Sequence, residues 1–196
     1  MYAIIRGRRS IRVYQDRSVP RELLERLLDG ASWAPSAHNR QPWRFVVLLE
    51  AAARRELASA MGERLREDLV ADRRPSEEIE ADVRRSFRRI EGAPVLIVVC
   101  LSMVDMDRYP DDKRDTAEHI MAIQSTALAA QNLLLAAHHE SLGACWLCAP
   151  LFCPDVVVKT LDLPSDWEPQ ALITLGYPAA TRESTRLPLE TRVIWR

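Results

Sequence analysis

The chain has 196 residues, of which 47% are hydrophobic and 28% are charged, and its 27 basic and 28 acidic side chains leave a net charge of −1. A chain of this length forms one domain with a substantial core. The balanced charge gives no reason to expect a nucleic acid or an anionic membrane as a partner. The N-terminal sequence MYAIIRGRRSIRVY turns basic too early for a secretory signal, so we expect a cytoplasmic protein whose four cysteines stay reduced.

The first half of the chain alternates between helical and extended patterns. A short helix is expected over residues 2–9, and a second helix begins at Val19-Pro20 and has leucines on one face. Residues 33–42 contain two prolines and are predicted to form a loop before the strand WRFVVLLE. Residues 51–69 are expected to be helical. The charged stretch at about 70–90 is predicted to be a solvated helical excursion, with a lid over a ligand as the alternative.

The second half contains the most apolar segments. Residues 93–101, APVLIVVCL, indicate a strand that is buried on both faces at the centre of a sheet. A helix from about Thr116 to His139, stopped near Gly143, contains polar residues that favour a buried helix over a membrane span. A short helix over 154–161, a strand over 170–176 and an extended piece over 192–195 complete one α/β-type domain spanning residues 1–196.

Three arginines and a serine lie together at the end of the first predicted helix: Arg8, Arg9, Ser10 and Arg12. Guanidinium forks and a hydroxyl suit a phosphate group. The positive charges repel one another unless an anion or carboxylates neutralise them. A basic surface turn is the alternative interpretation.

The loop APSAHNRQPWRF, residues 34–45, combines hydroxyl, amide and imidazole groups just before a strand. Such a loop presents donors and acceptors to a flat heteroaromatic ring, although a well-bonded turn has the same composition. His38 has no serine or cysteine nucleophile at a recognisable spacing. We therefore interpret it as a satisfied structural histidine rather than a general base.

The pair Cys145 and Cys148, with His138, His139 and Cys153 nearby, raises the question of a zinc site. A second pair of ligands at a typical spacing is missing, and a thioredoxin-like dithiol should open a helix near the N-terminus. We therefore expect no metal, and cysteines packed in the core or beneath a ligand. No G-x-G-x-x-G or P-loop is present, so redox chemistry requires a tightly held cofactor.

Four segments resemble the nitroreductase family in the order that the family has them: RRSIRVY, VPRELLERLL, WAPSAHNRQPWRFVVL and AAQNLLLAAHHESLGACW. The resemblance covers essentially the whole chain. It implies an α+β fold with a central mixed, mostly antiparallel sheet flanked by helices. It also implies a homodimer with the long core helix at its interface, and FMN bound there between both subunits.

The same resemblance implies a role for individual residues. Those expected to hold the FMN phosphate and ribityl chain are Arg8, Arg9, Ser10, Arg12 and Arg186. Those expected to reach the flavin from the partner subunit are Pro35, Ser36 and Asn39, with Gln41 close by. Those expected to lie against the ring are Trp146, Leu147 and Cys148. No catalytic side chain is expected, because FMN carries the hydride.

The segments YPDDKRDTAEH, LGACW, LDLPSDWEP and VIW resemble, more narrowly, the C-terminal reductase domain of a bifunctional protein of coenzyme F420 biosynthesis. The chain has no counterpart of that protein's glutamate ligase half, and Cys148 stands where glycine is expected. The resemblance implies ping-pong hydride transfer from a reduced nicotinamide or deazaflavin to dehydro-F420-0, a deazaflavin precursor. A general NAD(P)H-dependent reductase of nitro compounds or quinones is the nearest alternative. A flavin-cannibalising or dehalogenating enzyme of the same fold is a further alternative, and so is a non-catalytic flavin or deazaflavin carrier or interaction module.

Overall fold

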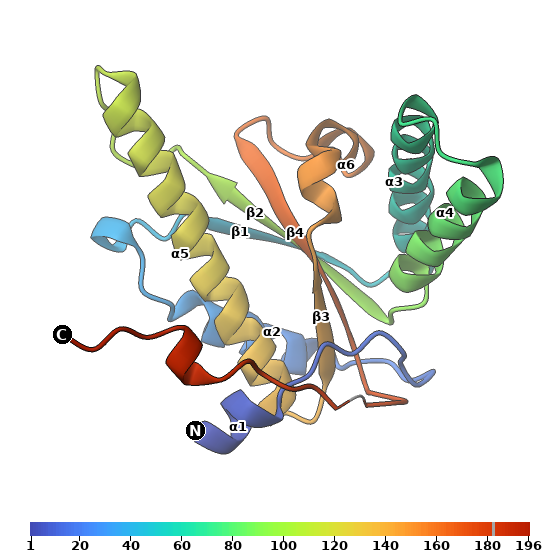
Figure 1. The fold of residues 1–196 in the computed structure, drawn as a ribbon, viewed down its shortest axis with the longest axis horizontal. Coiled ribbons are helices and arrows are strands. Elements are labelled where there is room, and N and C mark those ends of the chain that lie inside the picture. Colours follow the sequence, from blue (N-terminus) through green and yellow to red (C-terminus); the bar gives the residue numbers. More distant parts are fainter. Residues whose placement is uncertain (182) are drawn as a thin grey trace.

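The computed structural model describes residues 1–181 and 183–196, and these form a four-stranded antiparallel sheet between layers of helix (Figure 1). The strands are β1 (Trp43–Leu48), β2 (Val95–Ser102), β3 (Gly143–Leu147) and β4 (Trp167–Gly176). The α-helices are α1 (Tyr2–Gly7), α2 (Arg21–Ser32), α3 (Ala51–Ala71), α4 (Ser76–Glu91), α5 (Asp112–His139) and α6 (Pro154–Thr160). The architecture is α+β, as the resemblance implied.

The sheet has the strand order β1-β2-β4-β3, so the apolar run of β2 lies inside it, as predicted. Every residue of β2 is buried. Because side chains of a strand alternate between its faces, β2 contributes to two cores. Ile97 and Val99 belong to one core, whereas Leu96 and Val98 belong to the other.

The two faces of the sheet are covered by different helices. On one face, α2 and α5 pack together, and the leucines of α2 meet the inner side of α5. On the other face, α3 and α6 supply Leu57, Met61 and Val157. Burying a leucine fully stabilises the fold by about 1.5–3 kcal/mol. The apolar face of each helix therefore packs against the sheet.

The helix α5 is the longest element and begins earlier than the sequence suggested. The side chain of Asp111 caps it by accepting a hydrogen bond from the backbone N–H of Arg114 at 3.0 Å. This cap explains the start at Asp112 rather than near Thr116. By length and composition α5 qualifies as a membrane span, but its inner face packs against the sheet, as in the core helix of a soluble protein.

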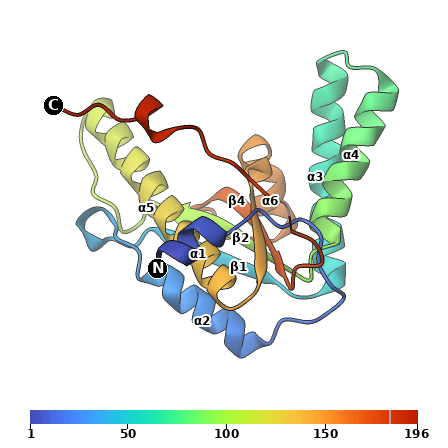
Figure 2. The same ribbon diagram turned by 60° about the horizontal axis from the view of Figure 1, so that its bottom comes forward.

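The helices α3 and α4 form a hairpin that stands away from the sheet (Figures 1 and 2). The expected excursion at 70–90 is therefore present, but α3 continues to Ala71 and α4 is amphipathic rather than wholly solvated. Ile79, Val83 and Ile90 of α4 are buried. The hairpin thus has its own apolar seam beneath a charged surface.

Several expectations about the ends of elements were wrong. The helix α5 ends at His139 as expected, but it stops before Ser141, which has a positive φ of 61°, and Gly143 belongs to a strand that the sequence did not reveal. Pro20 precedes α2 as its cap instead of lying in its first turn. The C-terminal residues 192–195 form no strand, and a short 3-10 turn, Leu189–Thr191, comes before them.

Candidate functional site

The segment that carries the arginine cluster lies along the edge of the sheet. Ser10 pairs with Ala144 of β3 in a parallel bridge, and the backbone N–H of Ile11 donates to the carbonyl of Ala144 at 3.0 Å. Gly143 permits this approach, because a Cβ there would lie 2.7 Å from the side chain of Ile11. The edge strand β3 therefore fixes the positions of the residues on both sides of Ser10.

The arginines of this cluster have no carboxylate partners within the described part of the chain. Arg9 instead donates to the carbonyls of Arg6 and Arg8, at 2.5 and 2.9 Å. Its guanidinium caps the end of α1, and it is partly committed to that role. Arg8 and Arg12 make no such side-chain hydrogen bond in the described residues, so their charge is available to an anion.

A pocket of about 260 Å³ opens beside the cluster, lined by Arg8, Arg9 and Ile11 together with residues of α5 and the start of the C-terminal segment. His138, Pro178 and Thr181 are among the lining residues that sequence reasoning did not assign to a site. They join it through the fold alone, because α1 packs onto the C-terminal half of α5. Gly7 allows this packing, since a Cβ there would lie 2.7 Å from the ring of His138.

Two buried groups lie next to the cluster. Burial raises the pKa of the Cys145 thiol, and the nearby charges of Arg12 and Arg8 and a hydrogen bond with Ser10 oppose that increase. Burial also raises the pKa of Tyr14, whose hydroxyl donates to the carbonyl of Ile11 at 2.6 Å and shares a hydrogen bond with Thr174. Both groups are therefore neutral at physiological pH, and Tyr14 holds the segment against β4.

The residues expected to lie against a flavin ring occupy the end of β3 and the turn after it. The side chain of Trp146 packs on the same core as α2 and α5, whereas Leu147 packs on the opposite one. The indole N–H of Trp146 donates to the sulfur of Cys148 at 3.1 Å. Cys100, Cys145 and Cys153 are buried and Cys148 is exposed, and all four cysteines are free.

The loop before β1 has an unusual backbone. His38, Asn39 and Gln41 have φ values of 50°, 55° and 52°. Non-glycine residues in this region carry strain, which surrounding contacts must hold in place. Ser36 provides one such contact by accepting a hydrogen bond from the backbone N–H of Gln41 at 3.1 Å.

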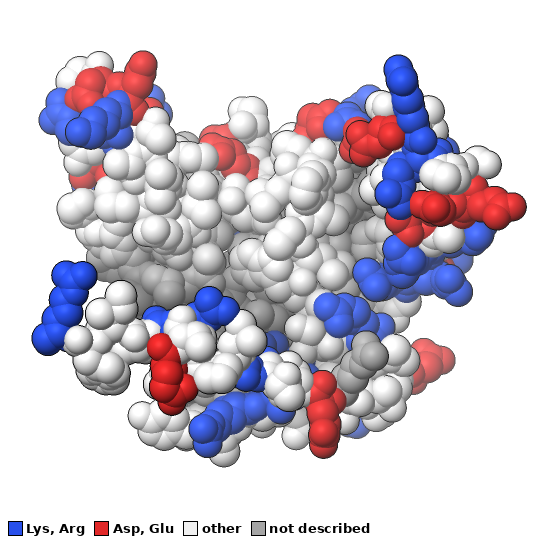
Figure 3. Space-filling view, viewed as in Figure 1, with Lys and Arg blue, Asp and Glu red and all other residues white. Residues whose placement is uncertain are grey.

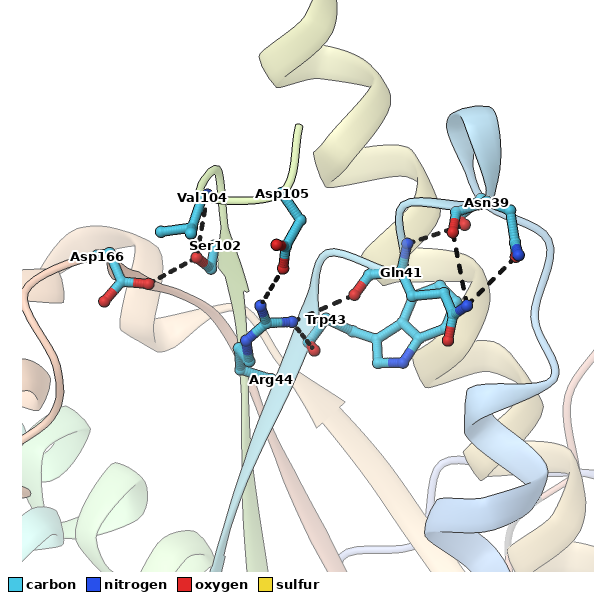
Figure 4. Close-up of polar contacts among 9 residues, drawn as sticks. Asn39, Gln41, Trp43, Arg44, Ser102, Val104, Asp105 and Asp166 are labelled. Atoms are coloured by element: carbon cyan, nitrogen blue, oxygen red, sulfur yellow. Dashed lines mark hydrogen bonds and ion pairs between the residues drawn. The ribbon is translucent and has the colours of Figure 1, made fainter. Parts of the chain in front are cut away.

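Further contacts hold the ends of this loop (Figure 4). The amide of Gln41 donates to the side chain of Asn39 at 3.4 Å, and Arg44 binds the carbonyl of Gln41 and the carboxylate of Asp105. On the other side, the backbone N–H of Ala37 donates to the hydroxyl of Ser125 in α5 at 3.2 Å. The loop is thus anchored to α5 and to the segment after β2.

His38 does not fit the expectation of a satisfied structural histidine. Its side chain is exposed, and its ring has no hydrogen-bond partner among residues 1–181 and 183–196. The backbone at His38 is left-handed, with φ 50° and ψ 22°. The histidine therefore remains free to bind a ligand.

A single subunit does not bring the two predicted parts of the site together. The loop of Pro35, Ser36, Asn39 and Gln41 contacts α5 at Ser125, whereas the arginine pocket meets α5 from Leu134 to His138. About 14 Å of helix rise separates Ser125 from Leu134. Arg186 is exposed and binds Ser184 and the carbonyl of Thr185, and no bond within the described chain joins it to the arginine cluster.

The surface beside α5 is poor in charge. In Figure 3 the charged groups gather at the tip of α5 and over the α3–α4 hairpin, and a hollowed, mostly uncharged area lies between them. Ile120, Ile123 and Leu128 of α5 are 48%, 37% and 46% exposed, and their spacing places them on one helical stripe. In the C-terminal segment Ile194 and Trp195 are more than 80% exposed. Exposed apolar residues of both segments are therefore available for contact with another molecule.

Comparison with known proteins agrees with this fold. Residues 5–177 match the model of the nitroreductase family. A protein of Methanothermobacter thermautotrophicus, provisionally named NADH dehydrogenase/NAD(P)H nitroreductase, is 34% identical over 89% of this chain and 75% of the relative. An iodotyrosine deiodinase of Haliscomenobacter hydrossis is 30% identical over 91% of this chain and 79% of the relative.

A solved structure carries the same fold and a bound cofactor. It is a Desulfovibrio desulfuricans protein, provisionally named a nitroreductase and crystallised with FMN. It is 30% identical to this chain, covers all of it and 95% of its own chain, and superposes with a TM-score of 0.77. The family match over most of the chain, together with these relatives, establishes that this protein belongs to the nitroreductase family of oxidoreductases.

Proposed function

We propose that this protein is an FMN-dependent oxidoreductase that works as a homodimer of single-domain subunits, residues 1–196, and passes a hydride from a reduced nicotinamide to a small-molecule acceptor. The observation that carries the proposal is the arginine cluster without carboxylate partners beside a pocket of about 260 Å³. The FMN found in a structural relative, and the nicotinamide in another relative's name, support the choice of cofactor and donor. A reduced deazaflavin is the alternative donor.

The residues of this chain fit the phosphate end of FMN. Arg8 and Arg12 would neutralise the phosphate, and Ser10 would donate its hydroxyl to the same end, because charge-assisted contacts with arginine are the strongest that a phosphate finds in a protein. Arg9, whose guanidinium already binds two backbone carbonyls, would contribute mainly its charge. Arg186 would join them when the C-terminal segment closes over the pocket that Thr181 already lines.

At the other end of the cofactor, the backbone after β3 would hold the isoalloxazine ring. Trp146 and Leu147 end the edge strand β3 and Cys148 follows it, so the side of this segment that does not pair with β4 would present backbone groups to a ligand. FMN, when bound, supplies the hydride chemistry. The protein would orient the ring and exclude water from it, and its arginines would neutralise the phosphate at the other end of the cofactor.

A second copy of this chain would complete the site. The apolar stripe of α5 would be buried between two subunits. With the two α5 helices antiparallel, the loop of Pro35, Ser36, Asn39 and Gln41 in one subunit would approach the arginine pocket of the other, because these features lie at different heights along α5. Sedimentation of Leu128→Asp should show a monomer where the unchanged protein sediments as a dimer.

For the acceptor, we propose dehydro-F420-0, a deazaflavin precursor, on the basis of sequence resemblance in the second half of the chain. A nitro compound or a quinone is the second candidate, favoured by the name of the archaeal relative. Steady-state rates on these acceptors with the same donor distinguish the two. A dehalogenating reaction and a non-catalytic flavin carrier are weaker alternatives, and a carrier would show no turnover with any donor.

The experiment that tests the cofactor is the visible absorbance spectrum of the purified protein, followed by identification of the chromophore that heat releases. We expect FMN close to one per subunit. A colourless protein that also fails to bind added FMN would overturn the proposal and favour a non-flavin interaction role.

A further inference from the structure

Three metal-ligating side chains from distant parts of the sequence meet beneath the strained loop. They are His38 in the loop, Asp107 in the segment after β2 and Glu118 in the second turn of α5. One ring nitrogen of His38 and one oxygen from each carboxylate all lie within 4.8 Å of one another. None of the three belongs to the proposed FMN contacts.

Glu118 is the unusual member of this cluster. It is fully buried, with 0% of its surface exposed, and one of its carboxylate oxygens, Oε2, has no hydrogen-bond partner in the described chain. The other oxygen, Oε1, accepts a hydrogen bond from the backbone N–H of Asp107, with a length of 3.3 Å. An ionised carboxylate in such a place is strongly unfavourable unless a cation or further donors compensate it.

The neighbouring side chains do not provide that cation. Arg40 pairs with Asp107 at 2.5 Å and not with Glu118, and its side chain is 44% exposed. Among residues 1–181 and 183–196, no lysine or arginine forms an ion pair with Glu118. His38 faces the carboxylates with a ring that has no other partner. The cluster therefore has two acids, one imidazole and an unsatisfied buried oxygen.

We propose that His38, Asp107 and Glu118 bind a divalent transition-metal ion of the zinc type. One imidazole nitrogen and two carboxylate oxygens are a donor set that Zn²⁺ accepts, with a fourth position for water. Two ligand atoms on one zinc ion are at most about 4.2 Å apart. The ligand atoms of the cluster lie within 4.8 Å of one another, so rotation of the ring and the carboxylates would have to bring them closer around the ion.

The surroundings of the cluster allow an ion to enter and give it a role. Asp107 also lines an open pocket of about 460 Å³, and His38 is exposed, so two of the three ligands are accessible from solvent. A bound ion would link the loop at His38 to α5 through Glu118 and to the segment after β2 through Asp107. It would thereby fasten the left-handed backbone of His38 and Asn39 in place. From the sequence, we considered a metal only at the cysteines and histidines of residues 138–153, because His38, Asp107 and Glu118 have no recognisable spacing.

The test is a titration with Zn²⁺, in which calorimetry measures the affinity and the number of ions bound. The full-length protein carries no tag and is first freed of metal with a chelator, and the titration is done with and without added FMN. We expect one ion per subunit, and at least about 10-fold weaker binding in His38→Ala and in Glu118→Gln. Matched controls are His139→Ala, an exposed histidine at the end of α5, and Asp105→Asn, a carboxylate that binds Arg44. Both controls should keep the affinity of the unchanged protein within about two-fold.

Because Zn²⁺ binding is measured directly, its result does not depend on flavin or on turnover. His38 is exposed, so its replacement leaves the fold intact and remains informative if Glu118→Gln proves unstable. The absence of Zn²⁺ binding, or equal affinity in both cluster variants and the unchanged protein, would overturn the proposal.

Discussion

The α3–α4 hairpin and the segment from Arg8 to Arg12 are both dense in arginine, but they treat the charge in opposite ways. In and around the hairpin, Arg66 binds Glu80 at 2.8 Å, Arg64 binds Asp155 at 2.7 Å and Arg55 binds Glu91 at 2.7 Å. In the Arg8–Arg12 segment, the described residues provide no carboxylate at all. Several arginines of the hairpin are thus paired with acids, although others, such as Arg84 and Arg89, are not, whereas none of the three arginines of the segment has an ion pair among the described residues.

This difference teaches that the number of arginines does not identify a binding site. A surface with alternating acids and bases at helical spacing pairs internally and gains little from any partner. In a cluster without acids the positive charges repel one another and destabilise the fold, and a bound anion removes that repulsion. The two regions therefore offer matched sites for substitution. The effects of such substitutions on the affinity for FMN should differ by orders of magnitude.

The largest effect is expected from removing the unpaired charge. In the double variant Arg8→Ala/Arg12→Ala, each lost contact with a phosphate costs about 1.5–3 kcal/mol, so the affinity for FMN should fall by roughly 100-fold or more. Fluorescence titration of FMN measures this loss. The matched control is Arg66→Ala/Arg85→Ala in the hairpin, where both arginines have acidic partners. Unchanged FMN occupancy in the Arg8/Arg12 variant would exclude the segment as the phosphate site.

A smaller effect is expected from moving the segment without changing its charge. In Gly143→Ala the new Cβ would lie 2.7 Å from Ile11, and the overpacking should cost about 1–3 kcal/mol of the free energy of unfolding and weaken FMN binding. The control is Gly62→Ala in α3, whose Cβ would meet Val83 at an ordinary 3.6 Å. That change should be neutral or stabilising, because alanine favours a helix. Denaturant unfolding of both variants checks the contrast, and equal destabilisation would contradict it.

The next effect concerns the pH dependence of stability. Burial raises the pKa of Tyr14 above its ordinary value, so folding favours the neutral phenol. This contribution is complete below the unfolded pKa of about 10 and is lost as the pH rises beyond it, by about 1 kcal/mol near pH 11. Tyr14→Phe should unfold with a weaker dependence on alkaline pH. A variant whose stability falls as steeply as that of the unchanged protein would show that Tyr14 is not the group responsible.

The smallest effect is expected from a single hairpin arginine. Arg66→Ala removes ion pairs with Glu63 and Glu80, but such partly exposed pairs are worth about 0.2–1 kcal/mol each, and salt screens them. The melting temperature should fall by only a few degrees, and FMN affinity should not change. A loss of FMN binding in this variant would mean that the hairpin contacts the cofactor.

Much of the fold could be predicted from the sequence, because its strongest signals are periodic. The leucines of α2, the apolar run of β2 and the long uncharged part of α5 each predict the correct element in the correct place. The strand β3 was missed because GACWL is short and contains glycine and cysteine instead of β-branched residues. Its partner is β4, far away in the chain, so tertiary pairing and not local preference makes it a strand.

The candidate site was predictable only in part. Arg8, Ser10 and Arg12 are close together in the sequence, so their cluster could be recognised without a structure. The absence of carboxylates around these residues could not be recognised from the sequence, because it depends on which residues the fold places near the cluster. The meeting of His38 and Glu118 lay beyond sequence reasoning for the same reason, since these residues belong to elements that pack only in three dimensions.

The left-handed residues of the loop before β1 also bear on how this protein tolerates change. A non-glycine residue in such a conformation stores about 1–3 kcal/mol, and His38, Asn39 and Gln41 do so within four positions. Glycine at Asn39 or Gln41 would release that strain, and selection for heat resistance would find these positions readily. The same glycines would loosen a loop that is held ready for its ligand. Thermal tolerance and ligand affinity are therefore expected to evolve in opposite directions at this loop.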